Sequence, residues 1–274
     1  MKILETKLRI GVKEPFRVLH ASDTHLTYAD MRDGERKVTL SGDREKIFSH
    51  AEEMLAFIGD VAEERGLPIL HSGDLIDFVS LANLEKVKDF TNRYDCFLAA
   101  GNHEFSQYVG EAWEDAEYRN QTLSQVQEAF QNDIRMASKI IGGVNFLAID
   151  NGYYLFEKEQ LEFLKTEEEK GLPIVLLIHD PLYDEALCHK ILQKSSCAGM
   201  VGVPEEQMQG YPPYRYRQQR ADEITLQTLE HIKTQPLIKA ILTGHLHCNY
   251  EGAFAEHIPQ IITSCTTVRV IEFC

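Results

Sequence analysis

The chain has 274 residues, of which 43% are apolar, enough for one large hydrophobic core or at most two small domains. Acidic residues outnumber basic ones by 43 to 28, and the formal net charge of −15 argues against nonspecific binding to nucleic acid or to an anionic membrane, because both need a basic face. Six scattered cysteines without Cys-x-x-Cys spacing favour a reduced, cytoplasmic setting. The first ten residues lack a signal-peptide core, and no apolar run is long enough to cross a bilayer.

Strands and helices alternate in the first half of the predicted secondary structure. In chain order we expect strands over 2–10 and 17–21, a helix over 43–65, a strand over 68–72, a helix over 81–93, a strand over 94–100, and loop with helix over 108–133. The helix over 43–65 is indicated by apolar residues that recur every three or four positions, namely Ile47, Ala51, Met54, Ile58 and Val61. Gly66 and Pro68 are typical of its end.

The second half continues this alternation and ends in strands. We expect one or two strands over 139–149, a helix over 157–170, a strand over 173–178, a helix over 184–193, irregular chain over 195–218, a helix over 222–233, a strand over 237–243, and strands over 250–254, 260–263 and 267–273. This order predicts an α/β fold with two layered sheets flanked by helices. Because no linker is visible, we expect a single domain over 1–274.

Five apolar runs end on side chains that are typical of metal ligands. The groups are Asp23 with His25, Asp74 with Asp77, Asn102 with His103, His179 alone, and His245 with His247. Loops at one edge of a sheet can converge although they are far apart in sequence. Carboxylate, imidazole and amide oxygen together suit Mn, Fe or Zn better than Ca. The strand that stops on Gly73-Asp74 makes Asp74 the candidate bridge between two ions.

Such a pair of ions suggests a particular chemistry. Two metal ions about 3.5–4 Å apart can clamp a phosphoryl group and generate hydroxide near neutral pH. A nearby imidazole can protonate the leaving oxygen, and a carboxylate can hold that imidazole in the required tautomer.

The five groups together resemble the motif series of the calcineurin-like metallophosphoesterases. That series is D-x-H, GD-x-x-D, GNH-[DE], H and GH-x-H. Here it reads Asp23-Thr24-His25, Gly73-Asp74-Leu75-Ile76-Asp77, Gly101-Asn102-His103-Glu104, His179 and Gly244-His245-Leu246-His247. Each piece is weak alone, but all five in order, spanning residues 23–247, are highly specific.

The resemblance implies a role for each of these residues. Asp23, His25 and His247 would bind the first metal, and Asn102, His179 and His245 the second, with Asp74 bridging the two. His103 would contact the phosphate and protonate the leaving group, and Asp77 would orient His103. The implied fold is a four-layer α/β/β/α sandwich of two mixed sheets. Glu104 departs from the commoner Asp, and Asp180 would add negative charge near the metals.

Structural roles remain open for some of these residues. Asn102 could only cap a turn, and Asp77 could only cap the following helix. His179 could be a hydrogen-bonded histidine at a strand end, and His103 could bind substrate while water supplies the proton. His20 and His71, which precede two of the motifs, are interpreted as core or supporting residues rather than ligands.

A segment rich in tyrosine and arginine is the most distinctive stretch outside the motifs. Residues 211–220 hold three Tyr and three Arg in a strongly acidic chain. We interpret 183–220 as a lid or insertion that helps to choose the substrate, with Tyr214 stacking on a base and Arg215 pairing with phosphate. The alternative is a surface loop whose arginines pair with Glu205, Glu206, Asp222 or Glu223.

These features predict a metal-dependent phosphoesterase with two Mn, Fe or Zn ions. Metal-bound hydroxide would attack phosphorus in a small phosphodiester or phosphomonoester, a nucleotide being one option. One alternative is a DNA exonuclease of the same family, although the net charge of −15 disfavours a long nucleic-acid substrate. The other is a noncatalytic binding module on this fold, which the retention of every ligand position disfavours.

Overall fold

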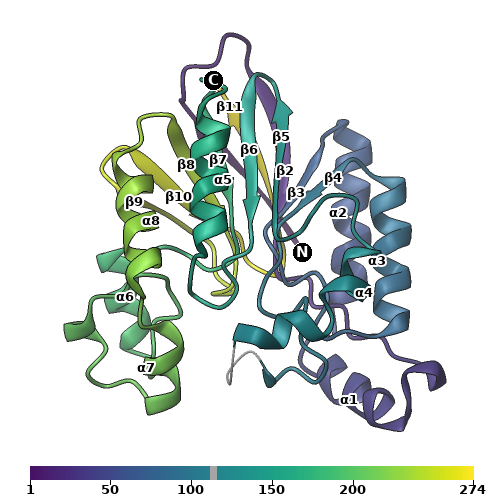
Figure 1. The fold of residues 1–274 in the computed structure, drawn as a ribbon. Helices are drawn as coiled ribbons and strands as arrows, with labels where there is room; N and C mark the ends of the chain where they lie inside the picture. The colour runs from purple at the N-terminus through teal and green to yellow at the C-terminus, as the bar shows by residue number, and fades with distance from the viewer. Residues whose placement is uncertain (112–115) are drawn as a thin grey trace.

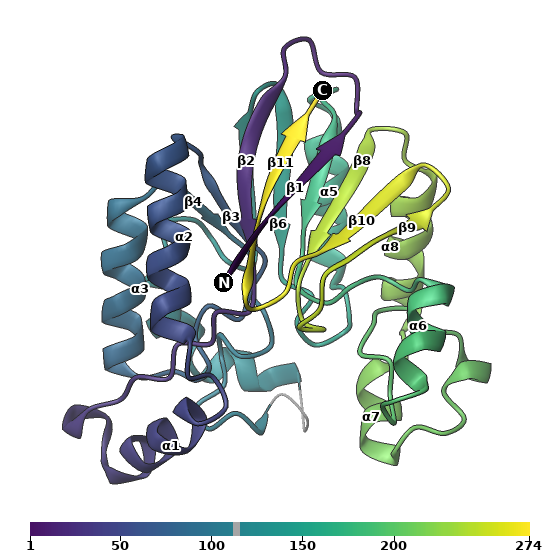
Figure 2. The same cartoon turned by 180° about the vertical axis from the view of Figure 1, so that it is seen from behind.

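The computed structural model describes residues 1–111 and 116–274, and its first sheet contains both ends of the chain. The strand order is β1 (Lys2–Leu8), β11 (Thr267–Phe273), β2 (Phe16–Ala21), β3 (Ile69–His71) and β4 (Cys96–Leu98). Strands β2, β3 and β4 are parallel, whereas β11 runs antiparallel to β2 and parallel to β1. Figure 2 shows β1 and β11 side by side, and the last strand of the chain lies between the first two, β1 and β2.

The second sheet has a parallel centre with an antiparallel strand at each edge. Its order is β5 (Met136–Ile141), β6 (Val144–Ile149), β7 (Ile174–Leu177), β8 (Ile238–Thr243), β10 (Ile258–Ile262) and β9 (Tyr250–Ala255). The β5–β6 hairpin turns at Gly142 and Gly143, whose φ angles of 57° and 80° suit a two-residue turn that glycine adopts at little cost. The expected strand or strands over 139–149 are therefore this hairpin.

The two sheets pack face to face, and helices cover their outer faces (Figure 1). Helices α2 (Ala51–Arg65) and α3 (Leu81–Arg93) cover the first sheet, and α5 (Lys158–Glu168) and α8 (Glu223–Thr234) cover the second. Strand β3 is buried on both faces: Ile69 packs in the cluster under the helices, and Leu70 in the cluster between the sheets. This arrangement confirms the predicted four-layer α/β/β/α sandwich.

The helix predicted over 43–65 is confirmed over 51–65, but residues 43–50 are not part of it. Helix α1 (Glu35–Glu45) ends before the break, and α2 begins at Ala51. Ile47, which the periodicity assigns to the buried face, is 63% exposed. Phe48 instead stacks on the ring of His25, with centroids 4.0 Å apart and an angle of 8° between the planes. The break between the two helices thus brings Phe48 against His25, a contact that helical periodicity does not predict.

The segment expected to be irregular, 195–218, also contains helix. After α6 (Glu185–Leu192), the short 3-10 helix η4 (Glu205–Gln207) and α7 (Pro213–Gln219) follow, and a proline suits the first turn of α7. Of the acidic stretch 108–133, residues 112–115 lie outside the described part, and the rest includes η3 (Ala116–Gln121) and α4 (Leu123–Gln127). The short 3-10 helix η1 (Met31–Asp33) precedes α1.

The carboxyl ends of β2, β3, β7 and β8 all meet at one edge of the sandwich. This edge lies at the bottom of Figure 1, between α1 on one side and α6 and α7 on the other. The predicted metal ligands, His103 and Asp77 lie in loops at this edge, whereas the predicted substrate residues Tyr214 and Arg215 lie in α7. Within residues 1–111 and 116–274, no helix is both long and apolar enough to cross a bilayer. The six cysteines are all free thiols.

Candidate functional site

Five of the predicted metal ligands have an unusual backbone conformation. The φ angles are 56° at Asp23, 52° at His25, 54° at Asp74, 66° at His245 and 47° at His247. Residues other than glycine rarely adopt this left-handed region, at a cost of about 1–3 kcal/mol each, and such strain concentrates at functional sites. Backbone hydrogen bonds tie the first two loops together, from Asp23 N to Gly73 O and from His25 N to Asp74 O. The loops are thus held in conformations that gather these side chains.

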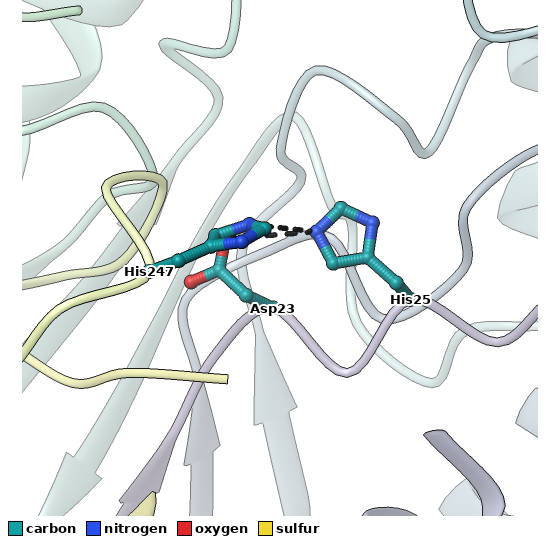
Figure 3. A group of neighbouring side chains, drawn as sticks. All are labelled: Asp23, His25 and His247. Carbon is teal, nitrogen blue, oxygen red and sulfur yellow. Dashed lines mark hydrogen bonds and ion pairs between the residues drawn. The ribbon is translucent and has the colours of Figure 1, made fainter. Parts of the chain in front are cut away.

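Asp23, His25 and His247 form the first group of candidate ligands (Figure 3). The Nε2 atoms of His25 and His247 lie 3.1 Å apart, and His247 Nε2 lies 3.3 Å from Asp23 Oδ1. On the other side of its ring, His25 Nδ1 donates to Asp77 Oδ1 at 3.0 Å. This hydrogen bond leaves His25 Nε2 with a lone pair that faces the group.

Asp74, His179 and His245 form the second group. His179 Nε2 lies 3.1 Å from Asp74 Oδ2 and 3.3 Å from His245 Nδ1. His179 Nδ1 donates to the backbone oxygen of Ser72 at 2.8 Å, so Nε2 is the ring nitrogen that faces the cluster.

Asp74 lies between the two groups. Its Oδ2 atom is 3.6 Å from His25 Nε2 and 3.1 Å from His179 Nε2, so one carboxylate faces a histidine of each group. Its Oδ1 atom accepts a hydrogen bond from His103 N at 2.9 Å. Burial raises the pKa of Asp74, but the surrounding imidazoles outweigh it and hold the pKa well below its usual range. An ionised carboxylate in this position can join two metal ions.

The side-chain oxygen of Asn102 is buried and accepts no hydrogen bond from the described residues. An unsatisfied buried acceptor costs about 1–3 kcal/mol, which a metal ion would relieve. The whole donor set of carboxylates, imidazoles and one amide oxygen fits two ions of the Mn, Fe or Zn type.

His103 lies beside both groups and is held by Asp77. Its Nδ1 atom lies 2.7 Å from the backbone oxygen of Asp77 and 3.3 Å from Oδ1. Asp77 also accepts from His25, and Arg44, which the sequence did not point to, donates to both of its oxygens. Burial raises the pKa of Asp77, but the hydrogen bonds from Arg44 and His25 outweigh it and lower the pKa to about 2. Asp77 therefore contacts a histidine of the first group as well as His103.

Glu104 joins two of the motif loops. Its buried carboxylate accepts hydrogen bonds from Gly101 N at 2.6 Å, Asp74 N at 2.8 Å and Leu75 N at 2.6 Å. Burial, together with the charge of Asp74, raises the pKa of Glu104 to about 7. The motif variant that the sequence left without a role thus fixes the backbone on which Asp74 stands.

A sixth strand end, which sequence reasoning missed, supports the site. Strand β6 ends on Asp150-Asn151-Gly152. Asn151 Oδ1 accepts from His179 N at 2.9 Å and from Asp180 N at 3.0 Å. A Cβ atom on Gly152 would lie 2.6 Å from Gly101 C and 2.7 Å from Asn102 N, so this loop packs closely on the Asn102 loop. The sequence did contain a signal for this strand end, because an apolar strand stops on polar residues there, as in the five motifs.

A cavity of about 500 Å³ opens over both groups. Its walls combine the cluster with residues from opposite sides of the site, including Arg44, Phe48, Tyr154, Ile191, Arg215 and Gln218. Arg215 Nη1 donates to Gln218 Oε1 at 2.7 Å. Tyr214 lies outside the cavity lining, with its side chain 42% exposed and its ring 5.3 Å from the Arg215 guanidinium carbon. Of the two predicted substrate residues, the structure thus brings Arg215 to the cavity.

His20 and His71 are buried beneath the cluster. The imidazole of His20 lies 2.9 Å from Ser72 Oγ and 2.8 Å from Thr263 Oγ1, and His71 Nε2 lies 3.0 Å from Thr24 Oγ1. Burial lowers the pKa of His20 to about 3 and that of His71 to about 4. Both rings therefore occupy supporting positions under the motif loops.

A family model for calcineurin-like phosphoesterases matches residues 16–249. The chain belongs to the calcineurin-like phosphoesterase family, whose members are metal-dependent hydrolases of phosphate esters. This match confirms the family that the motif series indicated. No curated protein matches the chain.

Several solved structures are similar at low sequence identity. A dimetal phosphatase from Danio rerio is 12% identical with a TM-score of 0.49, covering 92% of this chain and 88% of the phosphatase. A 5′-nucleotidase from Candida albicans is 15% identical with a TM-score of 0.42, over 91% of this chain and 46% of the nucleotidase. A Staphylococcus aureus protein described as a 5′-nucleotidase is 16% identical with a TM-score of 0.46, over 94% and 51%. The chain spans about half the length of these two nucleotidases.

Proposed function

We propose that the protein is a dinuclear metal-dependent phosphoesterase that hydrolyses a small phosphodiester or phosphomonoester, a nucleotide being one option. The observation that carries this proposal is the position of Asp74. One of its oxygens lies 3.6 Å from His25 Nε2 and 3.1 Å from His179 Nε2, which is the contact expected of a ligand shared by two ions.

The ligand roles follow the two groups around Asp74. Asp23, His25 and His247 would hold the first ion, and Asn102, His179 and His245 the second. Two such ions, when bound, supply Lewis acidity toward phosphoryl oxygens and lower the pKa of water. The hydrogen bonds from His25 Nδ1 to Asp77 and from His179 Nδ1 to Ser72 O leave Nε2 as the ring nitrogen that would bind a metal ion.

His103 is the proposed proton donor to the leaving oxygen. It lines the cavity, and its Nδ1 atom is anchored on Asp77 at the backbone oxygen, 2.7 Å away, and at Oδ1, 3.3 Å away. With Nδ1 engaged, Nε2 is the ring nitrogen that can give a proton to a leaving group, a role worth about 10²–10⁴-fold in rate. Asp77 would hold the ring in place.

A small substrate is favoured by the size of the cavity and by its walls. A volume of about 500 Å³ is in the usual range for small-molecule sites. We propose that 183–220 acts as a lid of a single domain over 1–274, because Ile191, Arg215 and Gln218 from this segment line the cavity. Arg215 would bind an anionic part of the substrate.

The decisive experiment compares diester and monoester turnover with metal content. Protein reconstituted with Mn²⁺ is assayed with bis-p-nitrophenyl phosphate and p-nitrophenyl phosphate, beside Asp74→Asn as control. We expect turnover of at least one ester by the wild type, and loss of both metals and turnover in the variant. Faster diester cleavage identifies a phosphodiesterase, and faster monoester cleavage a phosphatase.

Two results would contradict the proposal. Turnover by Asp74→Asn with two metals still bound would refute the bridging role. Two metals bound to a wild type that turns over neither the artificial esters nor a panel of cyclic and linear nucleotides would favour a binding module.

A further inference from the structure

Tyr154 touches the metal cluster from the loop after β6, outside all five motifs. Its phenol oxygen lies 2.7 Å from His245 Nε2, and its ring stands at 80° to the imidazole with the centroids 5.4 Å apart. Only 3% of the residue is exposed, yet it lines the cavity. Its φ angle of 63° places it with the five strained ligand residues in the left-handed region.

The other side of the His245 ring explains what this contact does. His245 Nδ1 lies 3.3 Å from His179 Nε2, within the second group. His245 Nδ1 also lies 3.2 Å from Asp180 Oδ1, and an ionised Asp180 would draw the ring proton to Nδ1. To bind a metal through Nδ1, the ring must instead carry its proton on Nε2. That N–H then donates to the oxygen of Tyr154. The buried phenol oxygen can accept this N–H, and in doing so it stabilises the metal-binding tautomer of His245.

The same device serves two other histidines of the cluster. His25 donates through Nδ1 to Asp77 Oδ1, and His179 donates through Nδ1 to Ser72 O. Histidine ligands ordinarily hold their second nitrogen in this way, and the partner fixes both the tautomer and the ring orientation. Tyr154 supplies the corresponding partner for His245.

The β6 loop is built to hold Tyr154 in place. Its backbone N–H lies 3.2 Å from Asp180 Oδ2 and 2.8 Å from the backbone oxygen of Asn151. Asp150, at the start of the loop, is fixed by Arg119 at 3.1 Å and Arg135 at 2.9 Å. These contacts offset the cost of the left-handed conformation at Tyr154.

We propose that Tyr154 is a positioning residue for the second metal, which it acts on by holding His245 in the tautomer and orientation that present Nδ1 to the ion. The inference rests on the proposed dinuclear site. It adds a residue that no motif contains and assigns the β6 loop to metal binding.

The test is a calorimetric titration of the metal-free protein with Mn²⁺, comparing the wild type with Tyr154→Phe. The variant keeps the ring and loses only the oxygen. We expect one of the two sites to weaken by about 10–100-fold while the other keeps its affinity. The Mn²⁺ concentration for half-maximal turnover should rise by a similar factor, with kcat at saturating Mn²⁺ within a few-fold of the wild type.

Tyr250→Phe is the matched control. It also removes one phenol hydrogen bond, from Tyr250 to Asp184 Oδ2 at 3.0 Å, but this residue does not line the cavity. We expect both Mn²⁺ sites to keep their affinities in this variant. Circular dichroism of all three proteins checks that each is folded to the same extent.

The outcomes separate this inference from the proposed function. If the wild type binds two Mn²⁺ ions and Tyr154→Phe binds both with unchanged affinity, the role of Tyr154 is refuted and the dinuclear site stands. Equal weakening of both sites, or an equal effect of Tyr250→Phe, also refutes it. A wild type that takes up no Mn²⁺ refutes the proposed function and the inference together.

Discussion

Arg44 and Asp77 form a two-point ion pair, with Arg44 Nε 2.5 Å from Asp77 Oδ2 and Nη2 2.9 Å from Oδ1. The same carboxylate receives a hydrogen bond from His25 and lies 3.3 Å from His103 Nδ1. Helix α1, of which the predicted helix held only residues 43–45, therefore reaches the site through one arginine. The pair connects the first metal group, the proposed proton donor and a wall of the cavity.

Replacing Arg44 by alanine should make the fold less stable near neutral pH. Because the pKa of Asp77 is about 2 in the folded protein and about 3.9 in unfolded chains, the interaction stabilises the fold above about pH 4 and is lost as the pH falls toward 2. We expect Arg44→Ala to lower the free energy of unfolding of metal-free protein by about 2 kcal/mol at pH 7. Urea unfolding between pH 7 and pH 3 should show the difference narrowing below pH 4.

Arg65→Ala is the control for this measurement. Arg65 pairs with Glu5 at 3.1 Å on the surface, where ion pairs contribute about 0–1 kcal/mol. A stability loss for Arg44→Ala that stays constant down to pH 3 would mean that Asp77 does not depend on Arg44 for its low pKa.

Gly101→Ala should disturb the ligand loops directly. A Cβ atom there would lie 2.7 Å from Asp74 N and 2.9 Å from His179 Cδ2, and neither atom can move away without displacing a candidate ligand residue. We expect a loss of about 1–3 kcal/mol in unfolding free energy from overpacking, together with weaker Mn²⁺ binding. Chemical unfolding and Mn²⁺ titration measure the two effects.

Gly210→Ala is the matched substitution, because a Cβ atom at Gly210 would meet nothing within 4 Å. It should leave stability and metal binding near wild type. If the two alanine variants behave alike, the close packing around Gly101 has no bearing on the site.

Arg215→Ala should lower kcat/KM for the best substrate by about 10-fold or more, since a charged hydrogen bond is worth about 1.5–3 kcal/mol. Tyr214→Ala should have a smaller effect, because Tyr214 lies outside the cavity lining. Arg217→Ala, an exposed arginine on the same helix, serves as control. If kcat/KM is unchanged in both Arg215→Ala and Tyr214→Ala, the proposal that the lid (183–220) helps to select the substrate is refuted.

Metal binding should stabilise the fold, and this effect can be measured without knowing the substrate. At a free Mn²⁺ concentration of about 100 times Kd, the expected gain is about 2.7 kcal/mol, or roughly 5 °C in Tm for a chain of this size. Differential scanning fluorimetry with and without a chelator measures the shift. Asp74→Asn should show little of it, and a full shift in that variant would contradict the shared-ligand role of Asp74.

The sequence pointed to the candidate ligand groups because each can be recognised from a short local pattern. An apolar strand that stops on Asp, Asn or His marks a sheet edge, and the motif residues at 23–25, 73–77 and 244–247 stand at such edges. Asp77 was expected to orient His103, and the structure adds contacts to His25 and Arg44. Those partners come from other segments, so no local pattern could show them.

The break between α1 and α2 shows why local periodicity fails near the site. Ile47 fits the helical repeat but is exposed, because the neighbouring Phe48 stacks on His25. Tyr154 is a second example, in which the local sequence gives no sign of a residue that contacts the site. Its neighbours in sequence resemble an ordinary turn, and only the approach of His245, 91 residues away, reveals its position in the cluster.

The amino-acid sequence alone was sufficient to predict the family, the layered α/β fold and the donor types of the candidate ligands, because strand ends and donor atoms are properties of short segments. The tertiary structure alone decided that Asp74 faces both histidine groups, that Arg44 pairs with Asp77, and that Tyr154 meets His245. The physical reason is that these contacts join loops from different strands, and their distances depend on how two sheets and their loops pack together.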